Sequence, residues 1–214
     1  MSKWIDFSID ERKAMIQGVV EAKNIDEASA EKDWWVTAIL YALFQTKAAE
    51  YLLFKGGTMV EQVYKDEDVD SDIVQTIKTV SPARTFLEKA FLLCEEYQKK
   101  DPRTYRMSRH FYDLEKLSHT DYMDKALNDS NLYYDIVEHR KKFYHVGYVD
   151  YDKELPASIM IVPSEELVPK YEVDYNDMRS SFIYGEALEF ADLLKFLETL
   201  QELFRKVPPK EKKG

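Results

Sequence analysis

The sequence predicts a mostly helical α+β protein, in which a small, reduced sheet packs on helices and a helical C-terminal region follows. Apolar residues recur at helical spacing over most of the 214 residues. Only seven prolines and six glycines interrupt the chain, which favours long regular segments. Two short runs, 51–55 and 73–80, are the predicted strands. Because a two-stranded sheet is marginal alone, we expect it to depend on the helices.

Each predicted helix follows from its apolar spacing and from the residue at its start. Asp26 is a favourable N-cap, and Ser81 followed by Pro82 is a favoured helix start. A helical turn is expected over 59–65, whereas three prolines predict a loop over 146–178. The other helices are predicted over 9–23, 26–48, 82–99, 102–117, 121–127, 130–145 and 186–205.

Composition narrows the class of protein. The formal net charge of -10 disfavours a passive nucleic-acid coat but allows an enzyme with a local basic groove. The single cysteine, Cys94, excludes an internal disulfide and is expected to be buried and inert. No apolar run approaches the ~18 residues of a membrane span, so we expect a cytoplasmic protein. Three parts are predicted along the chain: an N-terminal region over 1–80, a helical C-terminal region over 81–207, and a disordered basic tail over 208–214.

A glycine turn is the first candidate site. Lys55, Gly56, Gly57 and Thr58 follow the first predicted strand. Glycines let the backbone approach a phosphate closely, and the following amides and the threonine hydroxyl are donors to its oxygens. A tight turn without ligand is the alternative, and it is the more frequent reading of this spacing alone.

A pair of carboxylates is the second candidate. Asp70 and Asp72 stand two residues apart and would point to one face of a strand. Two carboxylates so placed can hold Mg²⁺ against a nucleoside triphosphate. A solvated acidic loop is the alternative. A calcium-binding EF-hand is set aside, because Ser71 and Ile77 occupy the positions that need Gly and Glu.

Three blocks of the chain resemble one family. Residues 54–58 look like the opening motif of AbiEii/AbiGii-type nucleotidyltransferase toxins, in the polymerase-β-like nucleotidyltransferase superfamily. Residues 79–89 resemble the helix that carries the family's lysine, and residues 106–114 resemble its Arg-x-x-Asp-Leu block. The resemblance implies that Lys89 and Asp113 face the same site as the paired carboxylates.

The resemblance also implies a function. It indicates a toxin of bacterial abortive-infection and toxin–antitoxin systems that transfers a nucleotidyl group from a nucleoside triphosphate to RNA, at a tRNA end. Mg²⁺ would be the cofactor, a cognate antitoxin a partner, and neither DNA nor a membrane is expected. Catalysis would fall to Asp70, Asp72, Lys89 and Asp113, with Asp113 an acid/base or a positioning carboxylate. Nucleotide contacts would come from Lys55, Gly56, Gly57, Thr58, Arg84 and Arg109.

The chain departs from the family pattern in its middle. Only about eight residues, 73–80, separate the acidic pair from the Ser-Pro block, where family members carry a longer insert with further strands. Three hypotheses therefore stay open. The chain is a nucleotidyltransferase with a reduced sheet, or it is an inactive homologue that binds nucleotide or protein as a scaffold. The third is a purely structural scaffold of reduced size that binds no ligand.

Overall fold

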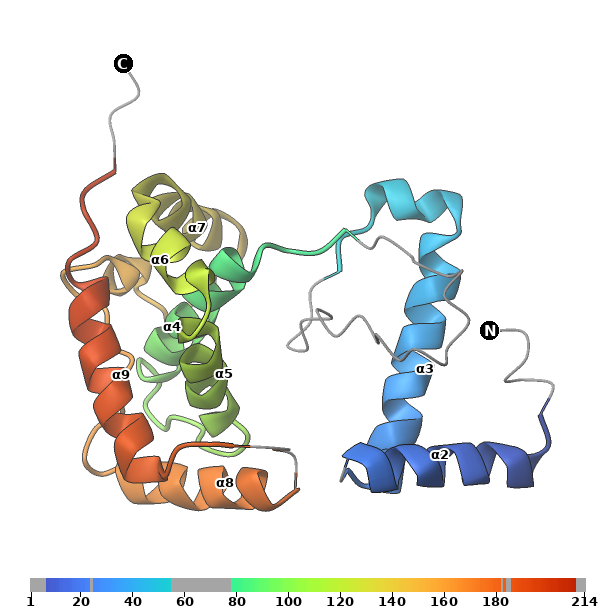
Figure 1. The fold of residues 1–214 in the computed structure, drawn as a ribbon. Coiled ribbons are helices and arrows are strands. Elements are labelled where there is room, and N and C mark those ends of the chain that lie inside the picture. The colour runs from blue at the N-terminus through green and yellow to red at the C-terminus, as the bar shows by residue number, and fades with distance from the viewer. Residues whose placement is uncertain (1–6, 24, 55–77, 182, 184–185, 211–214) are drawn as a thin grey trace. The chain divides into compact units, whose positions relative to one another are not determined.

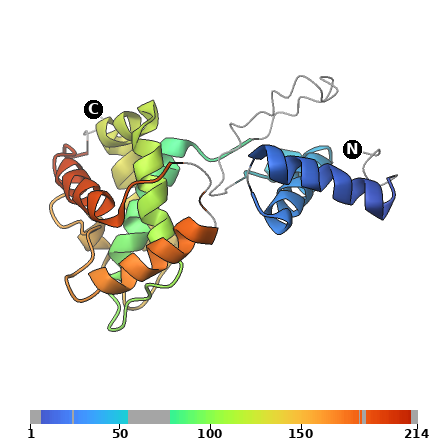
Figure 2. The same ribbon diagram turned by 60° about the horizontal axis from the view of Figure 1, so that its bottom comes forward.

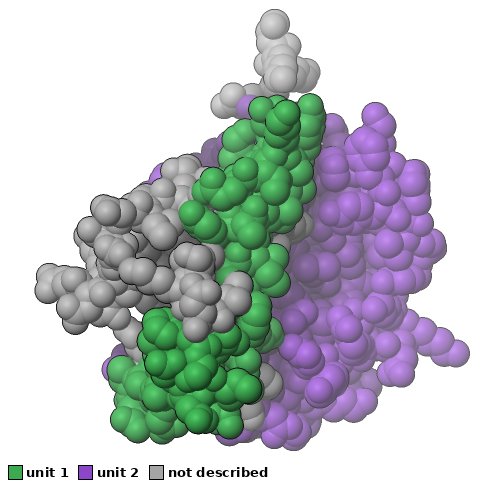
Figure 3. Space-filling view, turned by 90° about the vertical axis from the view of Figure 1, so that its right-hand side faces the viewer, with its two compact units in different colours: residues 1–80 green, residues 81–214 purple. Residues whose placement is uncertain are grey.

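The computed structural model describes residues 7–23, 25–54, 78–181, 183 and 186–210. The chain divides into two compact units, Met1–Val80 and Ser81–Gly214, which Figure 3 colours separately. Helices dominate the described part of both units (Figure 1). The mostly helical part of the predicted fold class is therefore confirmed.

Two helices and a short 3₁₀ turn make up the described part of the first unit: α2 (Ile9–Lys23), α3 (Glu27–Phe44) and η1 (Lys47–Tyr51). Asp26 caps α3 as predicted, because its carboxylate accepts a 2.9 Å hydrogen bond from the Ser29 amide. The helix ends at Phe44 and not at the predicted residue 48.

The core of this first unit is small. Of its described residues only Ile16, Ala30 and Leu40 are buried. Trp35 and Ile39, which belong to the apolar set of α3, are exposed. The two helices therefore bury little apolar surface in the part of the unit that the structure describes.

The predicted sheet is represented by a single contact. Phe54 and Thr79 form an isolated parallel bridge, in which the Phe54 amide donates to the Lys78 carbonyl (2.8 Å) and the Val80 amide donates to the Phe54 carbonyl (3.0 Å). No strand occurs among the described residues. Most of the run 73–80 and the predicted turn 59–65 lie outside them, so the sheet stays a prediction.

The second unit is a helical bundle around one central helix. That helix, α4, packs against α5, α6, α7 and the 3₁₀ turn η2, while α8 packs against α5 and α9. Figures 1 and 2 show α8 crossing the ends of α5 and α9. The elements are α4 (Pro82–Glu96), α5 (Ser108–Ser118), α6 (Asp121–Asn128), α7 (Ser130–Phe143), η2 (Tyr151–Glu154), α8 (Val168–Ser181) and α9 (Phe190–Phe204).

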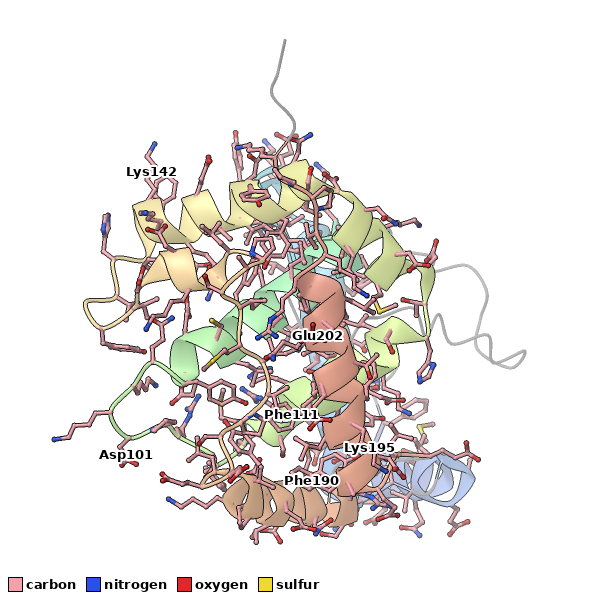
Figure 4. All side chains as sticks on the ribbon, turned by 90° about the vertical axis from the view of Figure 1, so that its left-hand side faces the viewer. Asp101, Phe111, Lys142, Phe190, Lys195 and Glu202 are labelled. Atoms are coloured by element: carbon pink, nitrogen blue, oxygen red, sulfur yellow. The ribbon has the colours of Figure 1, made fainter. Side chains whose placement is uncertain are left out.

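Aromatic side chains fill the core of this bundle. Phe86 of α4 stacks on Phe204 of α9, with ring centroids 5.7 Å apart, and Phe91 meets Tyr133 of α7 edge to face at 5.0 Å. On α9 the buried residues recur at intervals of three and four, which is why this helix packs along one face. They are Phe190, Leu193, Leu197, Leu200 and Phe204; Figure 4 labels Phe190 at the start of the helix.

The predicted loop over 146–178 was wrong in two places. Residues Tyr151–Glu154 form η2, and α8 begins at Val168. Pro169 does not break α8, because it lies in the first turn, where no backbone amide needs an acceptor. Tyr171 and Tyr175, one turn apart, are fully buried. Because the three prolines of this region favour a loop, the helical spacing of these two tyrosines was overlooked.

The predicted start of the fourth helix of the chain at Pro102 was also wrong. Here α5 begins at Ser108, and Arg106 just before it adopts a positive φ of 58°. Its cap comes from a distant helix: the Asp174 carboxylate of α8 accepts from the amides of Arg106 (2.5 Å) and Ser108 (2.9 Å) and from the Ser108 hydroxyl. Because the capping residue lies 66 residues away in the sequence, no residue near Ser108 marks the start of this helix.

Smaller differences concern helix ends and the C-terminus. The central helix ends at Glu96 and not at residue 99, and α9 begins at Phe190 and not at residue 186. In the predicted tail, Lys210 makes ion pairs with Asp135 (2.8 Å) and Glu138 (3.2 Å), and residues 211–214 lie outside the described part. Cys94 is buried as predicted, and burial raises the pKa of its thiol to about 11.

Candidate functional site

The central helix α4 carries charge within a nearly apolar environment. It starts at Ser81 and Pro82 as predicted, and the Thr85 amide donates the first helical hydrogen bond to the Ser81 carbonyl (3.0 Å). Two turns later, the charged residues Glu88 and Lys89 are buried among the apolar core residues of the same helix. A buried ammonium group must find a partner, because its desolvation is costly.

Lys89 finds this partner on the neighbouring helix. Its Nζ donates to Oδ2 of Asp113 on α5, 24 residues further along the chain. The lysine side chain is 11% exposed and the aspartate side chain 24%, so solvent reaches the pair from the aspartate side. A buried ion pair gains little stability over an apolar pair of the same size. Packing alone therefore does not account for it, and the pair is the centre of the candidate site.

A neutral histidine stands beside this pair. His110 lies three residues before Asp113 on α5 and is buried, so the two share one helix face. Burial, followed by the nearby charges of Lys89, Arg109 and Arg103, lowers its pKa to about 3. Its Nδ1 has no hydrogen-bond partner among the described residues. The imidazole therefore adds no positive charge beside the Lys89 ammonium at neutral pH.

The two predicted arginines do not form an ion pair with Asp113. Arg84 is occupied by Glu88 one turn along α4, with Nε 2.9 Å from Oε1. Arg109 is exposed and forms no ion pair with any residue that the structure describes. Although Arg109 and Asp113 have the spacing of a helical ion pair, Asp113 is engaged by Lys89 instead.

The remaining predicted site residues fall outside the described part of the chain. These are Lys55, Gly56, Gly57, Thr58, Asp70 and Asp72. Within the described part, no three side chains of metal-ligand type gather. Asp113 is engaged by an ammonium group, so we do not assign it to a metal ion.

A second buried charge cluster lies further along α4. The Arg140 guanidinium of α7 contacts Oε1 of Glu95 (2.7 Å) and Oε1 of Glu154 (3.4 Å). Burial is the main cause that raises the pKa of Glu154, to about 9, and Arg140 opposes this effect. The cluster joins α4, α7 and η2 and is closed to solvent, which indicates a structural role.

Sequence reasoning gave His110 no role, although it belongs to the block 106–114. The available signal was its spacing: three residues before Asp113, it falls on the same face of a helix.

Comparison with known protein families shows which family the chain belongs to. The model of the nucleotidyl transferase AbiEii toxin, a type IV toxin–antitoxin system family, matches residues 60–204. The match covers more than half of the chain. The chain belongs to this family. The resemblance seen in the sequence is thus confirmed, and the AbiEii match contains Lys89 and Asp113 as well as Asp70 and Asp72, but begins after Thr58.

Two further comparisons gave nothing: no curated protein and no solved structure matches the chain. Among the helices of the described part, none is both long and apolar enough to span a membrane. Membership of the AbiEii family therefore rests on the family model and supports a nucleotidyltransferase-like toxin with a cognate antitoxin.

Proposed function

We propose that this protein transfers a nucleotidyl group from a nucleoside triphosphate to a hydroxyl of RNA, at the end of a tRNA. The observation that supports the proposal most is the partly buried pair of Lys89 and Asp113 across α4 and α5. It lies within the part of the chain that matches the AbiEii family.

The chemistry gives each of these side chains a task. In the transfer, the acceptor oxygen forms a bond to the α-phosphorus and loses its proton to solvent, while pyrophosphate leaves with the bonding electrons. The Lys89 ammonium stabilises the negative charge that develops on the phosphate oxygens. Asp113 orients that ammonium. His110 is neutral and therefore adds no second positive charge beside Lys89. We therefore assign Asp113 as a positioning residue.

The proposal includes residues outside the described part. Asp70 and Asp72 would hold Mg²⁺, which when bound polarises the phosphate, at the edge of the small predicted sheet. The turn from Lys55 to Thr58 would cradle phosphate oxygens. Arg84 and Arg109 would add phosphate contacts; Arg109 is exposed and forms no ion pair with the described residues.

A labelling experiment tests the proposal. The purified protein is incubated with each labelled triphosphate, bacterial tRNA and Mg²⁺, and label on the RNA is measured after gel separation. We expect transfer by the natural protein and loss of transfer in Lys89→Met and in Asp70→Ala. Lys195→Met is the matched control, because Lys195 forms an exposed ion pair with Asp192 on α9.

The same experiment separates the first two hypotheses. Label transfer that is unaffected by Lys89→Met contradicts the assignment of the site. Triphosphate binding in calorimetry without any transfer identifies the chain as a nucleotide-binding scaffold, the alternative that its short middle segment raises.

A further inference from the structure

We propose that the end of α7 and the turn that follows it form a docking surface for single-stranded RNA. This inference rests on the proposed function and deepens it, since it assigns the acceptor a place on the protein. The surface, here called the aromatic platform, consists of Phe143, Tyr144 and Tyr148 with Lys99 and Lys142.

Three large aromatic side chains are exposed within six residues. The exposed fractions are 60% for Phe143, 43% for Tyr144 and 50% for Tyr148. Exposed aromatic residues that occur singly need no explanation, whereas a group of them marks an interaction surface. The core of this unit is otherwise well filled, with the other large aromatic residues of α7 half-buried or buried.

A cation accompanies each of these rings. Lys142 Nζ lies 5.2 Å from the centre of the Phe143 ring, and Lys99 Nζ lies 5.5 Å from that of Tyr148. The Arg140 guanidinium lies 4.9 Å from that of Tyr144. Figure 4 shows Lys142 on α7, pointing away from the body of the unit. The exposed rings offer stacking surfaces for bases. Lys142, which forms no ion pair with a residue that the structure describes, offers a charge for a phosphate.

Hydrogen bonds and an ion pair fix the backbone and side chains that carry the platform. The Gln98 side chain at the end of α4 donates to the Asp150 carbonyl (3.3 Å) and accepts from the Asp150 amide (2.8 Å). The Tyr151 hydroxyl accepts from the Val146 amide (3.3 Å). Beneath Tyr144, Arg140 is fixed by buried Glu95. Such preorganisation lowers the entropy cost of binding a flexible strand.

Local charge distinguishes this surface from the rest of an acidic chain. Residues 139–148 contain three lysine or arginine residues and no acidic residue, although the whole chain carries a net charge of -10. Ion pairs neutralise the nearby acids and their basic partners alike: Glu96 pairs with Lys99 (2.7 Å) and Asp152 pairs with Lys141 (2.8 Å). Arg140 is paired with Glu95, whereas Lys142 forms no ion pair with a described residue. This surface therefore favours a negatively charged partner over a purely apolar one.

The helix dipole explains only part of the pattern. Cations in the last turn of α7 are favourable at a helix C-terminus. That effect accounts for Lys141 and Lys142 but not for the exposed rings. Stacking of unpaired bases accounts for both features, because single-stranded nucleic acid is bound by aromatic side chains flanked by positive charge.

The platform is anchored to the helix that carries the candidate site, α4, through the ion pair of Arg140 with Glu95. Glu95, which fixes Arg140, follows Lys89 by six residues on α4, a rise of about 9 Å along the helix axis. One rigid helix thus supports both the group assigned to the triphosphate and the anchor of the platform.

Fluorescence anisotropy of a labelled single-stranded oligoadenylate RNA tests the surface in the full chain. We expect Phe143→Ala and Tyr148→Ala each to weaken binding about tenfold. Lys142→Ala should lower the slope of log affinity against log salt by about 0.7. Tyr105→Ala and Lys195→Ala are the matched controls, because both residues are exposed and lie outside the platform. Circular dichroism verifies that every variant is folded.

The outcomes separate this inference from the proposed function. Binding that the platform variants weaken supports the surface, whether or not the protein transfers nucleotides. Lys89→Met should abolish transfer yet keep RNA affinity. Equal affinity of the platform variants and the natural protein overturns the inference even if transfer is observed. Equally tight binding of duplex RNA of the same length also overturns it, because paired bases cannot stack on the rings.

Discussion

Removal of Asp113 is the perturbation that most clearly separates a buried functional pair from a surface one. In Asp113→Ala the Lys89 ammonium loses its partner while remaining only 11% exposed at the side chain. In Lys89→Met the remaining carboxylate is 24% exposed and retains access to water, and methionine fills most of the vacated volume. The two substitutions should therefore differ in cost.

The magnitudes follow from these exposures. Loss of one partner from a fully buried pair costs about 3–5 kcal/mol, so the partly exposed pair suggests about 2–3 kcal/mol for Asp113→Ala. Lys89→Met should cost about 1 kcal/mol, since the carboxylate stays hydrated and the packing is nearly conserved. The double variant should cost about 1–2 kcal/mol, less than the sum, because it leaves no unpaired buried charge.

Urea unfolding of the four proteins at neutral pH, followed by circular dichroism, measures this cycle. The reasoning predicts that Asp113→Ala is the least stable variant and that the second substitution restores stability. Additive costs, or a greater loss in Lys89→Met than in Asp113→Ala, would show that the pair is not coupled as the structure indicates.

Three further predictions concern the scaffold. Because the folded state raises the pKa of Glu154 from 4.5 to about 9, this carboxyl stabilises the fold below its unfolded pKa and the contribution is lost as pH rises toward 9; Glu154→Gln should flatten that decline in thermal unfolding, and an unchanged pH profile would refute it. Asp174→Ala removes three hydrogen bonds at the start of α5 and should cost about 1–2 kcal/mol in urea unfolding, whereas Asp177→Ala, an exposed neighbour on α8, should cost less than about 0.5 kcal/mol; equal losses would contradict the capping role. Leu197→Ala, at a fully buried position of α9, should cost about 2–5 kcal/mol, and a loss as small as that of exposed Leu92→Ala would place α9 outside the core.

The sequence predicts those elements whose signals are local. Asp26 caps α3 through its side chain. Pro82 lies in the first turn of α4 and follows Ser81, although the Ser81 side chain makes no capping hydrogen bond. The start of α5 was missed since its cap is Asp174, a residue brought close only by the packing of α8. That helix was itself missed because three prolines in its region predict a loop, although Pro169 is harmless in a first helical turn.

The candidate site shows the same division. The family blocks indicated Lys89 and Asp113, and the packing of α4 against α5 joins them. Helical spacing alone would favour Arg109 as the partner of Asp113, because spacing along one helix carries no information about the neighbouring helix. The neutrality of His110 could not be predicted either, since it depends on burial between two helices.

The rate of label transfer to tRNA by Lys89→Met, relative to the natural protein and to Lys195→Met, tests the central claim most directly. Removal of a charge that stabilises the transition state should lower the rate by about 10²–10³-fold, while urea unfolding shows the variant to be folded and the Lys195→Met rate stays within about twofold of the natural rate. Equal rates in the natural protein and in Lys89→Met would contradict the assignment of this pair to nucleotidyl transfer.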